Sequence, residues 1–114
     1  VEHAYQAAKT LDHAAAETIR FAANSYEAKR LGRRVAIRPD WGDSKVMVMQ
    51  DLIARKFALG SPLSTLLLDT GDSRLEEGNW WNDTFWGVCN GVGANWLGEL
   101  LMKRRARLRE FEGL

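Results

Sequence analysis

Residues 61–93, SPLSTLLLDTGDSRLEEGNWWNDTFWGVCNGVG, decide the fold class of this chain, because the secondary-structure pattern changes within them. Ser61 followed by Pro62 is typical of a helix start, with serine as the N-cap and proline at the first helical position. The leucines that follow predict a helix, and Gly71 provides a natural place for it to end. The first part of the stretch is therefore helical.

The second part, residues 74–93, has a different pattern. Short apolar pieces alternate there with Asn, Asp and Gly, and aromatic residues stand at alternate positions. Such alternation, interrupted by turn residues, predicts one or two short strands near residues 75–77 and 85–88. The chain is therefore expected to be α+β rather than purely helical.

On both sides of this stretch, apolar residues recur with helical spacing. Asp12 is expected to cap one helix, and either Asn24 or Ser25 to cap the next. Either Asp43 or Ser44 is expected to start a longer helix. The sequence thus predicts a compact, predominantly α-helical single domain with helices at residues 2–11, 12–22, 25–32, 44–60 and 94–111, and an irregular connector at 35–39.

Length and composition limit the class of protein. A chain of 114 residues suits one globular domain, which buries a core without disulfides or a structural metal. Cys89 is the only cysteine, so nothing indicates an oxidising compartment. Neither an apolar run of membrane-spanning length nor a signal-peptide pattern occurs, so we expect a cytoplasmic protein without a membrane partner. Because the helical pattern begins at Val1 with no N-cap before it, we also expect an upstream segment to be missing.

The net charge of +1 argues against a protein whose main task is to coat nucleic acid. Basic residues nevertheless cluster at 30–38 and at 103–109. The second cluster is typical of the last turns of a helix, where cations complement the helix dipole. Phosphate binding by either cluster is the alternative.

Common catalytic and cofactor motifs are absent from the sequence. It contains no GxSxG, no P-loop and no strand followed by GxGxxG. His3 and His13 are ten residues apart and Cys89 is distant, so the spacing of a zinc site is lacking. We therefore expect neither a metal nor a cofactor.

Carboxylates, amides and tryptophans remain as candidate functional groups. In the first predicted helix, Glu2, Gln6 and Lys9 share one face, while Ala4, Ala8 and Leu11 share the opposite face. The polar face would be solvated in most proteins.

A second group of candidates surrounds the aromatic loop. Asp83 could be a turn residue, Trp86 a core aromatic and Asn95 the cap of the last helix, or all three could line a pocket with Trp80 and Trp81 that stacks a planar ligand. Spacing alone leaves these alternatives open.

Taken together, several segments resemble the NADAR (YbiA-like) family, in the family's order and over nearly the whole chain. They are EHAYQAAK at 2–9, the W-x-x-x-K-x-x-x-M spacing at 41–49, KF at 56–57, LLLDTG at 66–71, LEE at 75–77, NDTFWG at 82–87 and GANWLGELLM at 93–102 with Arg105 after it. Each segment is weak by itself, but six or more in order are specific. The resemblance implies a YbiA-like fold, here lacking the N-terminal strand segment of the family.

The resemblance also implies an N-glycosidase that hydrolyses a C1′–N bond without a metal. Family members act on ribosylamino intermediates of riboflavin synthesis or on ADP-ribosylated guanine, so the partner would be a small nucleotide or an ADP-ribosylated nucleic acid. Glu2 is the first candidate for the catalytic carboxylate and Asp83 the second. The residues implied to bind substrate are Gln6, Lys9, Trp41, Lys45, Glu77, Trp86, Gly87 and Asn95.

Some positions depart from the family pattern. Trp80-Trp81 resembles a one-residue expansion of the loop, and Val88-Cys89 replaces smaller or acidic residues. These changes fall on the implied substrate wall and so bear on specificity more than on reaction type. The alternatives to an enzyme are a non-catalytic module that binds ADP-ribose or NAD, and a structural or regulatory partner protein.

Overall fold

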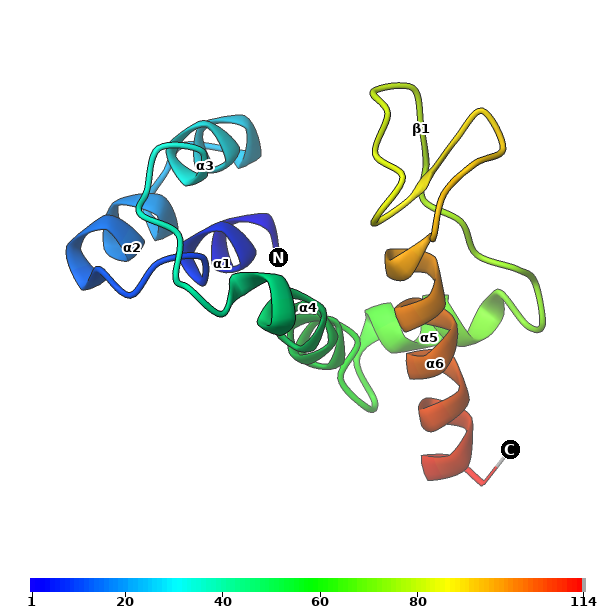
Figure 1. Cartoon of the computed structure of the whole chain (residues 1–114). Coiled ribbons are helices and arrows are strands. Elements are labelled where there is room, and N and C mark those ends of the chain that lie inside the picture. The colour runs from blue at the N-terminus through cyan, green and yellow to red at the C-terminus, as the bar shows by residue number, and fades with distance from the viewer. Residues whose placement is uncertain (114) are drawn as a thin grey trace. The chain divides into compact units, whose positions relative to one another are not determined.

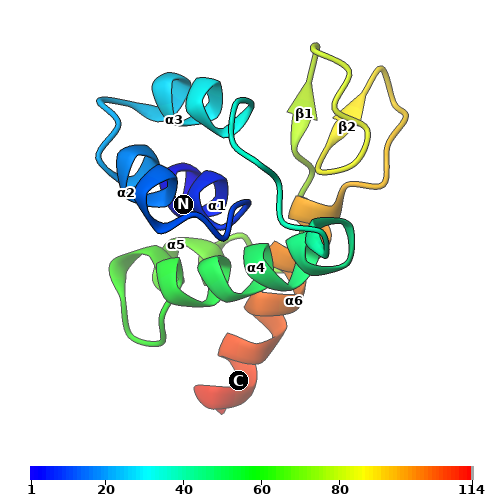
Figure 2. The same cartoon turned by 60° about the vertical axis from the view of Figure 1, so that its left-hand side comes forward.

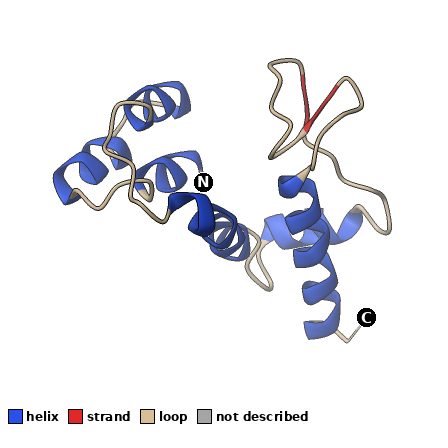
Figure 3. Cartoon of the chain, in the orientation of Figure 1, coloured by secondary structure: helices blue, strands red, loops and turns tan. Residues whose placement is uncertain are grey.

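The computed structural model describes residues 1–113, which form six helices and two short strands (Figures 1 and 3). The chain divides into two compact units, Val1–Leu52 and Ile53–Leu114. The elements are α1 Glu2–Ala7, α2 His13–Arg20, α3 Ser25–Gly32, α4 Trp41–Lys56, α5 Pro62–Asp69, β1 Gly78–Asn79, β2 Val88–Cys89 and α6 Trp96–Phe111. The predominantly helical α+β class is confirmed. No helix among these elements is both long and apolar enough to cross a bilayer.

In the first unit, α1, α2 and α3 pack around a small apolar core (Figure 2). The core consists of Ala7, Ala16, Ile19 and Ala28. Two predicted caps are confirmed: the Asp12 side chain accepts hydrogen bonds from the first turn of α2, and Asn24, not Ser25, caps α3. Small core residues let the helices approach closely, which matters for the site described below.

The first helix differs from its prediction. It ends at Ala7, and its buried side carries Tyr5, Gln6 and Ala7. Ala4 and Leu11, which we expected on the apolar face, are exposed. The helix is short because the chain turns toward the cap of α2, and the carbonyl of Lys9 accepts a hydrogen bond from the Arg38 N–H at 2.7 Å instead of continuing the helix.

The helix α4 begins two residues earlier than the first start that we expected. The backbone carbonyl of Asp40 accepts hydrogen bonds from the N–H groups of Asp43 and Ser44, and its carboxylate accepts one from the Ser44 hydroxyl. The Arg38 guanidinium and this hydroxyl lower the pKa of Asp40 to about 2. The predicted starts thus lie in the first turn, while Asp40 holds the position before it.

In the second unit, α5 packs against α6. Leu67 of α5 and Leu100 and Leu108 of α6 are buried, whereas Phe111 at the end of α6 is half exposed. The predicted start of α5 is confirmed, since Ser61 is the N-cap and its hydroxyl accepts a hydrogen bond from the Ser64 N–H at 3.1 Å.

Replacing Ser61 with alanine is expected to lower the free energy of unfolding by about 1 kcal/mol, because the Ser64 N–H loses its acceptor. Urea unfolding of the wild type and the variant measures this loss. Ser73→Ala is the matched control, since Ser73 is exposed and its side chain has no hydrogen bond in the described part of the chain. Equal stability of Ser61→Ala and wild type would contradict a capping role.

The basic residues of α6 have structural partners. The Arg104 Nε donates to the carbonyl of Phe57 at 3.1 Å, and Arg105, which is buried, donates to the Thr70 hydroxyl at 2.7 Å. Arg109 contacts the Gly71 carbonyl and the Asp72 carboxylate. These contacts connect α6 to the turns that precede and follow α5. The basic residues at 103–109 therefore stabilise the packing of the second unit in addition to complementing the helix dipole.

The two strands are parallel, with Gly78 opposite Val88 and Asn79 opposite Cys89. The first strand was predicted at 75–77 and lies just after these residues, while the second overlaps its prediction only at Val88. Contacts with distant residues fix the position of the strands. The Glu77 carbonyl accepts a hydrogen bond from the Val88 N–H at 2.8 Å, and the Glu77 N–H donates one to Asn95 Oδ1 at 3.0 Å. Local alternation in the sequence carries no information on that contact.

Candidate functional site

The carboxylate of Glu2 is held in place from two helices. Gln6, one turn later on α1, donates from Nε2 to Glu2 Oε2 at 2.9 Å. The ammonium group of Lys29 on α3 lies 3.5 Å from the other oxygen, Oε1. The Glu2 side chain is still 27% exposed, so it is oriented by the protein and accessible to a ligand. The spacing of four residues on one helix face produces the first of these contacts.

Cationic groups lie close to this carboxylate. Burial lowers the pKa of Lys9; the Glu2 charge opposes this shift, while Arg33 and Lys45 add to it. Lys9 therefore lies near enough to Glu2, Arg33 and Lys45 to interact electrostatically with each of them. A carboxylate beside several cations suits a ligand in which a developing positive charge and a phosphate lie on one molecule.

Aromatic rings extend this group. Trp41, the first residue of α4, is 9% exposed, and its ring centroid lies 5.1 Å from that of Tyr5. The Lys9 Nζ lies 5.8 Å from the Tyr5 centroid. Trp41, which the family resemblance implies as a substrate-binding residue, thus packs against Tyr5 of α1. Sequence reasoning missed Tyr5, although its position three residues after Glu2 and four before Lys9 marks it as their neighbour on the helix.

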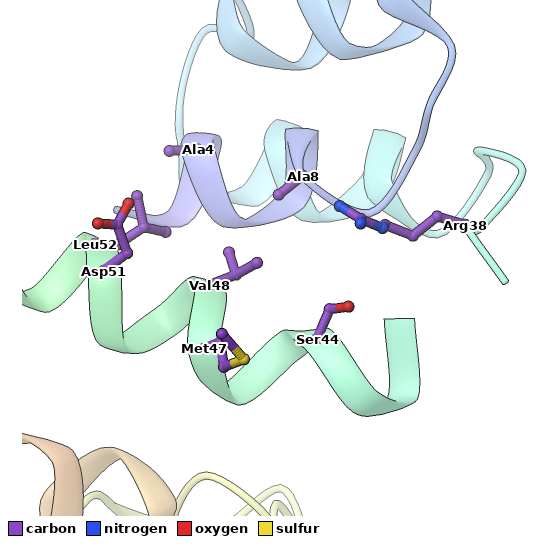
Figure 4. A pocket seen from close by; sticks show the side chains of 8 residues that line it. All are labelled: Ala4, Ala8, Arg38, Ser44, Met47, Val48, Asp51 and Leu52. Atoms are coloured by element: carbon purple, nitrogen blue, oxygen red, sulfur yellow. The ribbon is translucent and has the colours of Figure 1, made fainter. Parts of the chain in front are cut away.

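A groove of about 410 Å³ runs between α1 and α4 within the first unit (Figure 4). Its wall is mostly apolar, with Ala8, which directly follows α1, and Val48 on α4 on facing sides, and Arg38 and Asp51 as its charged members. Sequence reasoning did not predict this groove, because the spacing of Ala4 and Ala8 indicated only that they share a helix face. None of the predicted site residues lines it.

In the second unit, Asp83 organises a turn. Its Oδ1 accepts hydrogen bonds from the N–H groups of Phe85 at 3.1 Å and Trp86 at 2.9 Å. Its own N–H donates to the Asn79 side chain at 2.9 Å. The turn interpretation of Asp83 is confirmed, and these bonds orient the carboxylate toward its own backbone.

Asn95 is fully buried, with a left-handed backbone at φ 55°. Its side chain accepts from the Glu77 N–H at 3.0 Å and donates to the Leu75 carbonyl at 2.8 Å. Asn95 occupies the N-cap position of α6, as one interpretation of the sequence suggested, but its side chain makes no cap bond. The first N–H groups of α6 donate instead to the carbonyls of Phe85 and Trp86.

Gly87 and Glu77 are in close contact. A Cβ at Gly87 would lie 2.1 Å from the Glu77 carbonyl oxygen and 2.0 Å from its Oε2, so only glycine fits there. Trp86 packs edge-on against Phe85 at a centroid distance of 4.8 Å. Trp80 in the same loop is 86% exposed and forms an edge contact with the half-exposed Trp81.

The predicted site residues thus form two groups. Glu2, Gln6 and Lys9 meet in the first unit with Trp41 and Lys45 nearby, and the members in the second unit are Glu77, Asp83, Trp86, Gly87 and Asn95. Within the described residues, no group of three His, Cys, Asp or Glu side chains is placed to hold a metal ion.

Comparison with known proteins identifies the family. The sequence model of the NADAR domain matches residues 1–109 of this chain. The chain belongs to the NADAR family. The fold agrees with this assignment: the solution structure of the Escherichia coli protein YbiA superposes with a TM-score of 0.87 at 37% identity, covering 97% of this chain and 67% of YbiA. The YbiA-like fold predicted from the sequence is therefore confirmed.

Several NADAR relatives carry functional names. A riboflavin biosynthesis protein of Vibrio vulnificus is 40% identical over 96% of this chain, which spans 30% of that protein's length. An N-glycosidase of Nostoc punctiforme is 38% identical over the whole chain and 76% of its own length. The N-glycosidase YbiA of Shigella flexneri is 39% identical over 94% of this chain and 68% of its own length.

Proposed function

We propose that this NADAR chain is an N-glycosidase that hydrolyses the bond between C1′ of a ribose and a nitrogen atom, with Glu2 as the catalytic carboxylate. The observation that carries the proposal is the position of Glu2, which is fixed by Gln6 and Lys29 and yet partly accessible. Relatives named as N-glycosidases at 38–39% identity support the same reaction class.

The chemistry suits a single oriented carboxylate. As the C1′–N bond breaks, its electron pair leaves with the nitrogen, and positive charge develops on C1′ and the ring oxygen. The negative charge of Glu2 stabilises that state, or accepts a proton from the water whose oxygen bonds to C1′. The departing nitrogen takes up a proton, so the products are the free sugar and the amine or base.

Lys9, Lys45 and Arg33 supply the positive charge that a phosphate on the sugar requires. Substrate contacts by Trp41 and by Glu77, Trp86, Gly87 and Asn95 stay predictions, as does a second catalytic role for Asp83. The reaction proposed for Glu2 does not depend on any of them.

For the substrate, we propose a ribosylamino pyrimidine phosphate of the riboflavin type. Its support is the riboflavin biosynthesis protein of Vibrio vulnificus, whose matching region is 40% identical to this chain. An ADP-ribosylated guanine is the second candidate, in which the same carboxylate would face C1′ of the ADP-ribose.

Mass spectrometry of the chain incubated with three compounds tests this proposal. The compounds are a ribosylamino pyrimidine phosphate, ADP-ribosylated guanosine and NAD. We expect free ribose phosphate from the first, growing linearly with enzyme concentration. Free ADP-ribose from the second alone would replace the substrate class but keep the reaction. If any of the compounds binds saturably but all three are recovered intact, the proposed enzymatic activity is overturned and a nucleotide-binding module is favoured.

A further inference from the structure

Gly32 of α3 lies directly against the side chain of Gln6 of α1. A Cβ built on Gly32 would be 2.1 Å from Gln6 Oε1 and 2.9 Å from Gln6 Cδ. Real Cβ atoms essentially never approach another heavy atom closer than about 3 Å, so no side chain fits at position 32 while Gln6 keeps its present position. The backbone of Gly32 is helical and does not itself require glycine. The reason for glycine here is therefore space.

The side-chain amide of Gln6 is buried, and a single hydrogen bond fixes it within the described residues. Only 6% of the residue is exposed, and its Nε2 donates to Glu2. Within the described residues, its Oε1 is buried without a hydrogen-bond partner. A hydrogen bond fixes one side of this amide, and the close approach of Gly32 confines the other side.

The same helix also reaches Glu2 directly. Lys29, three residues before Gly32 on α3, places its ammonium 3.5 Å from Glu2 Oε1. Helix α3 thus meets both supports of the Glu2 carboxylate: Lys29 is one of them, and Gly32 lies against the other, the Gln6 amide.

We propose that Gly32 is a positioning residue: by confining the Gln6 amide, it holds the Glu2 carboxylate in its catalytic orientation. This inference rests on the proposed N-glycosidase function, since it assigns a purpose to the orientation of Glu2. Gly32 itself touches neither the substrate nor the reacting atoms.

Gly32→Ala tests the proposal. The new methyl group meets the flexible end of Gln6, so the Gln6 amide swings away while the helices stay folded, and alanine favours a helix more than glycine does. We expect kcat to fall about 30-fold, because a small misplacement of a catalytic group is costly, while KM changes by less than about 3-fold.

Gly42→Ala is the matched control, because a Cβ at Gly42 of α4 meets nothing within 4 Å. Its kcat should stay within about 2-fold of the wild type. Circular dichroism and thermal unfolding of both variants establish that they fold. An unchanged kcat in a folded Gly32→Ala protein would overturn the proposal.

A double-mutant cycle separates positioning from general damage. Gln6→Ala removes the amide that Gly32 confines, so adding Gly32→Ala to Gln6→Ala should cost no further activity. If the fold-losses of activity caused by the two single substitutions multiply in the double variant, Gly32 acts by a route other than the Gln6 amide, and the proposal is overturned.

A measurement without substrate keeps this inference distinct from the proposed function. The NMR signals of the Gln6 side-chain amide and the Glu2 carboxyl carbon should shift in Gly32→Ala and stay in place in Gly42→Ala. Unshifted signals overturn the positioning role even if the wild type is active. If the signals shift in Gly32→Ala but the wild type cleaves none of the three compounds, the positioning of Glu2 by Gly32 stands and only the proposed function is overturned.

Discussion

Glu2→Gln is expected to lower kcat about 10³-fold, which corresponds to about 4 kcal/mol of transition-state stabilisation. Glutamine has the shape of glutamate, and its side-chain oxygen still accepts the hydrogen bond from Gln6. The ion pair with the half-exposed Lys29 is lost, which costs little stability at a solvated position. What disappears is the negative charge opposite the developing positive charge on C1′. Steady-state kinetics with the substrate that the wild type cleaves measures this loss.

The control for this variant is Glu27→Gln. Glu27 lies on α3 of the same unit and pairs with Arg30 on the protein surface. Its replacement removes the same charge from the unit without touching Glu2, and activity should stay within about 2-fold of the wild type. Wild-type turnover by a folded Glu2→Gln protein would remove Glu2 from the mechanism, whereas equal losses in both variants would point to net charge as the cause.

Asn95→Ala is expected to lower the free energy of unfolding by about 3 kcal/mol. The substitution leaves the Glu77 N–H and the Leu75 carbonyl without their partners inside the protein, and each unpaired buried group costs about 1–3 kcal/mol. Alanine also tolerates the left-handed backbone at this position less well than asparagine. Chemical unfolding followed by tryptophan fluorescence measures the difference.

Asn90→Ala separates these two causes. Asn90 has a similar left-handed backbone, with φ 51°, but it is exposed. Its replacement should cost about 1 kcal/mol, the backbone contribution alone. A loss for Asn95→Ala no larger than that for Asn90→Ala would contradict a structural role for the buried amide.

The features predicted well from the sequence are those that depend on near neighbours in the chain. Asp12, Asn24 and Ser61 were predicted as helix caps and are caps, because a cap bond joins residues two or three apart. The end of α1 and the position of β1 depended instead on contacts with distant segments, through Arg38 and Asn95, and were misplaced.

The same distinction applies to the candidate site. Glu2, Gln6 and Lys9 were grouped from their spacing on one helix, and the structure confirms the contact between Glu2 and Gln6. Lys29 and Gly32 reach this group from another helix, so no spacing on α1 could indicate them. Asn95 shows the limit of local reasoning, because its place before a helix suggested a cap while its side chain supports residues twenty positions earlier.

The bonds of Asn95 also bear on how this region can change in evolution. They tie residues 75–77 to the start of α6, so the segment that carries both strands is closed where it begins and ends. Within it, hydrogen bonds between Asn79 and Asp83 close a turn around the exposed Trp80 and Trp81. Substitutions at these two tryptophans therefore change the surface chemistry of the turn without touching the bonds that hold β1, β2 and α6, so this surface can diversify under selection independently of folding.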